Sequence, residues 1–284
     1  MQEVELIIPM TDGFHMFCRQ WTSSGEAKRA VVCIPGTGGD AEFFRPIGTD
    51  LAARGNEVYA LDLRGFGNSV ETGLQRGDTS NFKRHLQDLE EAVRFIGTVQ
   101  SKKVFMFGHS HGCTYALWLA ANYPNLIDGL VLAAPPFAAT SKVHRREFLK
   151  FALLLIFAPK TMYSFGQDRA ERGSEGLANN PLIAKSLSIR WLFGSKKYLL
   201  DKLFQNASQI QKPTLIIQGD LDTSTLPEGA QTLFDLLRVN DKSIHLFPNA
   251  NHFLYGALSP TLDCGDPEKK LEVARVVSNW LNLH

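Results

Sequence analysis

The pattern of apolar and polar residues predicts a hairpin followed by a parallel sheet. Residues 4–8 and 14–18 read as strands on either side of Thr11-Asp12-Gly13, a turn whose glycine tolerates a positive φ angle. From residue 30 onward, short runs that are apolar on successive residues alternate with helical patterns. Strands covered by helices on both faces have this composition, so we expect a mostly parallel sheet flanked by helices.

Together with the hairpin, these runs predict about eight strands. The later strands are expected at residues 30–34, 58–61, 104–107, 130–133, 214–217 and 243–247. Helical patterns occupy residues 44–54, 79–97, 112–123, 226–238 and 267–282.

Residues 136–211 interrupt this alternation, because they contain helical segments but no clear strand. We therefore expect a core of residues 1–135 and 212–284, with residues 136–211 inserted after the sixth strand as a helical cap. Insertions in a parallel sheet leave from the carboxyl ends of the strands, where ligands also bind, so the cap should cover the site.

Composition and charge narrow the possible partners. The 284 residues carry 30 basic and 29 acidic side chains, a net charge of +1, which gives no reason to expect a nucleic acid partner. The most apolar stretch, residues 148–158, is shorter than the roughly 20 residues that cross a bilayer, so no transmembrane segment is expected. Neither a metal-ligand cluster nor a phosphate-binding glycine motif is present, and we expect no cofactor.

The cysteines and the N-terminus favour a cytoplasmic location. Cys18, Cys33, Cys113 and Cys264 are far apart and lack the density of a disulfide scaffold. Residues 1–5 include two glutamates and lead directly into a strand, unlike a signal peptide with its basic start and apolar run.

The main candidate for chemistry is Gly108-His109-Ser110-His111-Gly112, which directly follows one expected strand and precedes a helix. A G-x-S-x-G motif in this position holds its serine on a tight turn, and the glycines remove side chains that would collide there. The placement on strand, turn and helix makes Ser110 a candidate nucleophile.

This motif and the strand order resemble the α/β-hydrolase superfamily over nearly the whole chain. Residues 62–69, DLRGFGNS, are similar to the D-x-R-G-x-G-x-S stretch of the lysophospholipase and monoacylglycerol lipase branch. The resemblance implies an α/β-hydrolase fold and a serine hydrolase whose catalytic residues follow the order serine, acid, histidine. Asp62 itself is better explained as an acceptor for loop amides.

A serine hydroxyl needs a base, and His252 has the position that the resemblance implies, just beyond the last expected strand. The other histidines have more ordinary interpretations: His15, His85, His144 and His284 as surface or packing residues, His245 within a strand, and His109 and His111 projecting away from the nucleophile.

The acid that orients this base is expected after the strand at residues 214–217. The resemblance implies glycine, two residues and then aspartate, which selects Asp222 in Gly219-Asp220-Leu221-Asp222. Asp220 is the competing candidate and could instead cap the turn.

Backbone amides should stabilise the negative charge that develops on the attacked carbonyl oxygen. One donor is expected to be the N–H of His111, the residue after the nucleophile. By resemblance, the other is the N–H of Thr37 in Pro35-Gly36-Thr37-Gly38-Gly39. Many relatives have His-Gly where this chain has Pro35-Gly36; we expect catalysis to survive this difference.

The substrate pocket is expected to be apolar. Residues 148–157 are too uniformly apolar for a solvent-facing helix, and a helix buried between cap and core is favoured over the wall of an acyl pocket. The expected pocket residues are Gly36, Gly38, Phe151, Leu154 and Trp191.

We therefore expect a carboxylic ester hydrolase (esterase or lipase) acting on a small-molecule ester with an apolar acyl group. Thioester, lactone, amide or peptide hydrolysis on the same triad is the alternative, as is a non-catalytic binding protein of this fold. The apolar cap could also serve as an interface between copies in a homo-oligomer.

Overall fold

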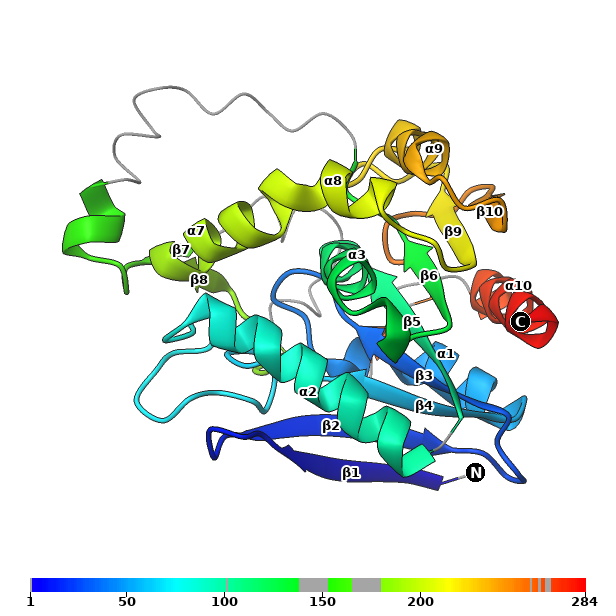
Figure 1. Ribbon diagram of the computed structural model, residues 1–284, viewed down its shortest axis with the longest axis horizontal. Helices are drawn as coiled ribbons and strands as arrows, with labels where there is room; N and C mark the ends of the chain where they lie inside the picture. The colour runs from blue at the N-terminus through cyan, green and yellow to red at the C-terminus, as the bar shows by residue number, and fades with distance from the viewer. Residues whose placement is uncertain are drawn as a thin grey trace.

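The computed structural model describes residues 2–100, 102–137, 153–164, 180–255, 257–259, 262–263 and 267–284. Its main strands are β1 (Gln2–Pro9), β2 (His15–Thr22), β3 (Arg29–Ile34), β4 (Asn56–Leu61), β5 (Lys103–His109), β6 (Gly129–Ala133), β9 (Thr214–Gly219) and β10 (Lys242–Phe247). They form one eight-stranded sheet in the order β1-β2-β4-β3-β5-β6-β9-β10 (Figure 1).

The sheet is mostly parallel, as expected. Strand β2 pairs antiparallel with β1 and β4, whereas the other neighbouring strands pair in parallel. The hairpin turn has Gly13 at φ 83°, and the amide of Phe14 donates to Asp12. These observations confirm the predicted eight-stranded sheet and its opening hairpin.

Helices pack on both faces of the sheet, at bounds within a few residues of those predicted. They are α1 (Arg45–Ala53), α2 (Phe82–Gln100), α3 (Gly112–Asn122), α9 (Pro227–Leu236) and α10 (Pro267–Leu283). The helix predicted at residues 44–54 is α1, and a 3₁₀ turn, η1 (Ala41–Phe44), precedes it.

Alternate residues of β3 explain how the two apolar layers form. Val32 and Ile34 belong to a buried cluster with residues of α2 and α3, and Val31 and Cys33 belong to a second cluster with residues of α1 and α10. Because successive side chains of a strand point to opposite faces, a strand that is apolar throughout fills both layers.

The segment between β6 and β9 differs from the expectation of helices alone. Short strands β7 (Met162–Ser164) and β8 (Ser186–Ser188) pair antiparallel, outside the main sheet. They are followed by α7 (Ile189–Tyr198), the 3₁₀ turn η3 (Leu200–Lys202) and α8 (Leu203–Ser208). The sequence signal for β7 and β8 is weak because each has three residues.

A short 3₁₀ turn and a small two-stranded sheet lie outside the main sheet and its helices. The 3₁₀ turn η2 (Pro124–Leu126) follows α3, and strands β11 (Ala257–Ser259) and β12 (Leu262–Asp263) pair with each other. Within the described part of the chain, none of the helices combines the length and apolar character that spanning a bilayer requires.

Candidate active site

The turn between β5 and α3 carries Ser110 in a left-handed backbone conformation, with φ 52°. The amide of Ser110 donates to the carbonyl of Ala133 at the end of β6, which ties the turn to the neighbouring strand. A non-glycine residue at positive φ is strained and clusters at functional sites. The geometry is that of the serine turn that G-x-S-x-G predicts.

Packing explains the two glycines of this motif. A β-carbon at position 112 would lie 2.1 Å from the carbonyl oxygen of Ile34, and one at position 108 would lie 2.7 Å from the amide nitrogen of Cys113. Both separations are well below van der Waals contact, so larger residues would force strand and helix apart.

Asp222 and His252 meet at the carboxyl ends of β9 and β10. The Oδ2 atom of Asp222 lies 2.8 Å from Nδ1 of His252. A carboxylate can only accept, so Nδ1 carries the hydrogen, which leaves the lone pair of neutral histidine on Nε2. An imidazole in this state can accept a proton at Nε2.

Asp222 is fully surrounded by hydrogen-bond donors. Its Oδ1 accepts from the amides of Ser224 and Thr225, and its Oδ2 also accepts from the Thr225 hydroxyl and the Gln218 side-chain amide. Burial opposes ionisation, but the hydrogen bonds from His252 and Thr225 outweigh it and lower the pKa of Asp222 to about 2. The carboxylate therefore stays ionised at neutral pH.

The competing carboxylate, Asp220, has a different environment. Its side chain is exposed, and its amide donates to the carbonyl of Phe247. The structure therefore brings Asp222, and not Asp220, to the imidazole.

Two contacts connect the Ser110 turn with the other loops. Nε2 of His109 lies 2.9 Å from the carbonyl oxygen of His252, so Nε2–H donates and supports the loop that carries the imidazole. A β-carbon on Gly36 would lie 3.1 Å from Cβ of Ser110. The ring of His109 is buried and packs against the ring of His252, with 4.9 Å between centroids.

A small cavity lies next to this turn. It is lined by Pro35, Gly36, Thr37, Gly38, Gly39, Leu63, Phe66, His111, Tyr115 and Trp191. The centre of a water molecule can reach a volume of about 10 Å³ inside it, which is room for roughly one water. The residues predicted to supply both oxyanion donors, Thr37 and His111, therefore border one space with Trp191 of α7.

Comparison with known proteins identifies the family. The sequence model of the family described as serine aminopeptidase, S33 (Hydrolase_4), matches residues 25–257. The chain belongs to this family.

The relatives of this S33 family member include several lipases. Monoglyceride lipase of Mus musculus is 26% identical over 282 residues, covering 95% of this chain and 88% of the mouse protein. Monoacylglycerol lipase of Mycolicibacterium smegmatis is 24% identical over 276 residues, covering 93% of this chain and 91% of its own. A solved structure of a soluble variant of monoglyceride lipase from Saccharomyces cerevisiae is similar with a TM-score of 0.76 and 21% identity, covering 98% and 94% of the two chains. The predicted resemblance to the monoacylglycerol lipase branch is confirmed.

Two predicted pocket residues of this family member remain. Phe151 lies outside the described residues. Leu154 does not line the cavity and is half-buried in a helical turn at residues 153–157. Leu153, Ile156 and Phe157 of this turn are 57%, 70% and 80% exposed. The interpretation as a helix buried on both faces is therefore wrong for these residues. The turn lies at the outer end of α7, away from the sheet (Figure 1).

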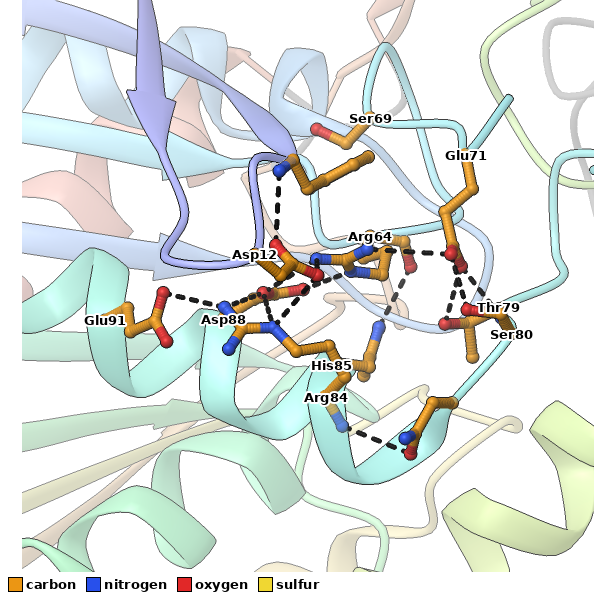
Figure 2. Close-up of polar contacts among 12 residues, drawn as sticks. Asp12, Arg64, Ser69, Glu71, Thr79, Ser80, Arg84, His85, Asp88 and Glu91 are labelled. Atoms are coloured by element: carbon orange, nitrogen blue, oxygen red, sulfur yellow. Dashed lines mark hydrogen bonds and ion pairs between the residues drawn. The ribbon is translucent and has the colours of Figure 1, made fainter.

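The D-x-R-G segment shapes one wall of the cavity. Asp62 accepts from the amides of Ala41 and Asn68, which confirms its interpretation as an acceptor for loop amides. Arg64 is buried and forms ion pairs with Asp88, Asp12 and Glu71 (Figure 2). Leu63 and Phe66, on either side of Arg64, line the cavity, so this ion-pair network holds the wall in place.

His85 connects that network to the cavity. Its Nδ1 donates to the carbonyl of Arg64 at 2.9 Å, so its Nε2 accepts from the hydroxyl of Tyr115 at 2.8 Å. Burial lowers the pKa of His85 to about 3, which keeps the ring neutral. His144 lies outside the described residues. Within the described ranges, no cluster of three or more His, Cys, Asp or Glu side chains could hold a metal ion.

Proposed function

We propose that this protein is a serine hydrolase that cleaves carboxylic esters with an apolar acyl group through an acyl-enzyme on Ser110. The proposal is carried by the Asp222–His252 hydrogen bond, formed next to the strained turn that presents Ser110. The monoglyceride lipase relatives favour ester hydrolysis among the reactions that such a site can perform. Monoacylglycerols are accordingly the first substrates to test.

In the proposed reaction, Nε2 of His252 accepts the proton of the Ser110 hydroxyl as Oγ attacks the carbonyl carbon. The same nitrogen then protonates the leaving alcohol, and an acyl-enzyme results. Nε2 next accepts a proton from water as the water oxygen attacks the acyl carbon. It then returns this proton to Oγ of Ser110 as the acyl–Oγ bond breaks and the acid leaves. Asp222 stabilises the protonated imidazole in each half of the cycle without taking its proton.

The oxyanion is proposed to bind to the backbone amides of His111 and Thr37. Fixed donors of this kind are worth about 3 kcal/mol each in the transition state. Pro35, at the position where many relatives carry histidine, borders the same cavity. The amide of residue 37 is two residues further on, so we expect the donor to be preserved.

Residues 136–211 are proposed to form the cap between core segments 1–135 and 212–284. In support, Trp191 borders the cavity, and the amide of Ala184 donates to the carbonyl of Gly38. Leu63, Phe66 and Trp191 make the walls of this water-sized cavity apolar, in keeping with an apolar acyl group bound beside it.

We also propose a reducing, cytoplasmic location. Cys18, Cys33 and Cys113 are free thiols in the interior, which is common where disulfides do not form.

A fluorophosphonate probe tests the chemistry directly. Purified protein should be labelled at one serine, and Ser110→Ala should abolish labelling. If folded wild-type protein is not labelled, the chain is a binding protein that has kept the fold without turnover.

A substrate panel tests the class of bond. Monoacylglycerols and p-nitrophenyl esters of increasing acyl length should be hydrolysed faster than thioesters, lactones and peptide amides. The family description includes aminopeptidases, so faster cleavage of amides than of every ester would replace the esterase proposal with a peptidase.

A further inference from the structure

The two loops proposed to supply oxyanion donors are both bonded to one stretch of the chain, residues 180–195. The carbonyl of Gly38, the residue after Thr37, accepts from the amide of Ala184 at 2.9 Å. The imidazole of His111 lies with Nε2 3.0 Å from the hydroxyl of Ser195 in α7. One bond is therefore made by a proposed oxyanion donor, His111, and the other by the residue next to the second proposed donor, Thr37.

This stretch is itself fixed to the core. The guanidinium of Arg190 forms two hydrogen bonds with the carboxylate of Asp78, at 2.7 and 2.6 Å. The amide of Ser188 donates to the carbonyl of Gly77, and the side chain of Asn180 donates to Asp40. Such anchoring makes residues 180–195 a firm support for the loops that they contact.

The His111–Ser195 bond is buried, and its position is set by aromatic neighbours. Ser195 is 3% and His111 is 8% exposed. The ring of His111 packs between Tyr115 of α3 and Trp191 of α7, at centroid distances of 5.3 and 5.6 Å. Burial lowers the pKa of His111 to about 4, so the ring is neutral at neutral pH. A buried neutral imidazole that loses its partner is left with an unsatisfied polar atom, which is costly.

Helix propensity offers no reason for a serine at position 195. Position 195 lies inside α7, where alanine forms helix better than serine. The hydroxyl is instead directed at the residue that follows the nucleophile.

We propose that Ser195 is a positioning residue that fixes His111, so that the cap segment sets the geometry of the oxyanion hole in addition to covering it. His111 precedes the first residue of α3, and holding its side chain restrains the rotation of its own peptide unit. Direction matters because an oxyanion donor must lie about 2.7–3.1 Å from the oxygen that it stabilises. This inference rests on the proposed ester hydrolysis.

The test compares Ser195→Ala with Ser208→Ala, a matched change in α8, where the hydroxyl donates to the local carbonyl of Gln205. Removing an oxyanion donor costs about 10²- to 10³-fold in kcat, and misdirecting one should cost less, roughly tenfold. We expect Ser195→Ala to lose this factor in kcat with KM changed less than about twofold, because the interaction acts in the transition state. Ser208→Ala should match wild type.

An alkylboronic acid provides a second readout, because its tetrahedral adduct with a catalytic serine places an oxygen in the oxyanion hole. The affinity of Ser195→Ala for this inhibitor should fall by the same factor as kcat. Fluorophosphonate labelling of Ser195→Ala should still reach one serine per chain, which separates this inference from the proposed nucleophile.

A double-mutant cycle completes the test. If Ser195 acts through His111, Ser195→Ala should cost little more in a His111→Leu background. Independent, multiplying effects would overturn the proposal, as would a loss confined to KM or a kcat equal to that of Ser208→Ala. Should Ser195→Ala not fold, Ser195→Cys provides the comparison: it keeps the size with a weaker hydrogen bond, and an unchanged kcat there would also reject the inference. Absence of labelling in wild type would instead reject the proposed function.

Discussion

Asp222 and His252 are 30 residues apart in the sequence, and their side chains are 2.8 Å apart in the fold. They follow β9 and β10, which pair in parallel along their whole length. Because parallel neighbours end at the same edge of the sheet, the loops after them meet. Asp222 is the only one of the two competing aspartates, 220 and 222, with a buried side chain.

The first prediction separates these aspartates. Asp222→Asn should lower kcat by about 10²- to 10⁴-fold, because the neutral amide cannot stabilise the imidazolium or hold the correct tautomer. Asp220→Asn should retain nearly full activity. Steady-state kinetics with a p-nitrophenyl ester measures both, and the opposite ranking would identify Asp220 as the acid.

The second prediction concerns Thr225, whose hydroxyl donates to Oδ2 of Asp222 at 2.8 Å. Thr225→Val should reduce kcat by about tenfold, since a hydrogen bond to a charged group is worth about 1.5–3 kcal/mol. Thr225→Ser keeps the hydroxyl and should be close to wild type. Equal activity of the valine and serine variants would mean that the other donors, the backbone amides, Gln218 and His252, are enough to hold the carboxylate.

The third prediction tests the space beside the nucleophile. A β-carbon on Gly36 would lie 3.1 Å from Cβ of Ser110 and 3.3 Å from Nδ1 of His109. Gly36→Ala should therefore displace the serine and lower kcat by about tenfold or more, since a small misplacement of reacting groups is costly. Gly25→Ala, where nothing lies within 4 Å, is the control. A fully active Gly36→Ala would show that the loop can move aside.

The fourth prediction compares a buried with an exposed ion pair. Asp88 is fully buried and bonded to Arg64, so Asp88→Ala leaves a buried guanidinium without that partner and should cost about 3–5 kcal/mol in the free energy of unfolding. Arg94, whose side chain is 57% exposed, pairs with Glu90. Arg94→Ala should cost less than about 1 kcal/mol. Urea unfolding measures the free energy of unfolding of both variants. Similar losses of stability would contradict the prediction that burial makes the Asp88–Arg64 pair more important.

The fifth prediction concerns acid stability. Burial lowers the pKa of His85 and His109 to about 3 and that of His111 to about 4. The unfolded chain protonates these residues near pH 6.5, whereas the folded chain does not. The unfolded state therefore binds more protons, and the free energy of unfolding should fall as the pH drops from about 6.5 towards 4.

Some carboxyls act in the opposite direction. Burial raises the pKa of Asp62 to about 7 and also raises the pKa of Asp40, Asp50 and Asp88, which favours the folded state where these groups hold a proton that the unfolded chain has lost. The largest of these shifts, at Asp62, offsets one of the three histidines, so urea midpoints at pH 7, 6 and 5 should still decrease. His85→Gln should make the decrease shallower. A midpoint that rises between pH 7 and 5 would contradict the neutral state of these rings.

Local sequence was sufficient for the elements and for the main candidates of the site. Successive apolar residues in β3 and β5 require burial on both faces, which already implies a covered parallel sheet. The glycines at 108 and 112 fit the tight turn between a strand and a helix. These features depend on neighbours within a few residues, so periodicity and turn chemistry reveal them. Asp222 and His252 were selected by the resemblance to the α/β-hydrolase superfamily, which implies an acid and a base after the last two strands.

Contacts between distant segments could only come from the tertiary structure. The support of the His252 loop by His109, the donors that Gln218 and Thr225 supply to Asp222, and the bond between His111 and Ser195 join side chains whose partners depend on how loops pack. A histidine or serine has the same hydrogen-bonding groups wherever it lies in the sequence. Only the packing of the loops decides which protein group replaces water as its hydrogen-bond partner. The exposed turn at residues 153–157 has the same cause: its apolar residues predicted burial, but its place at the outer end of α7 determined their exposure.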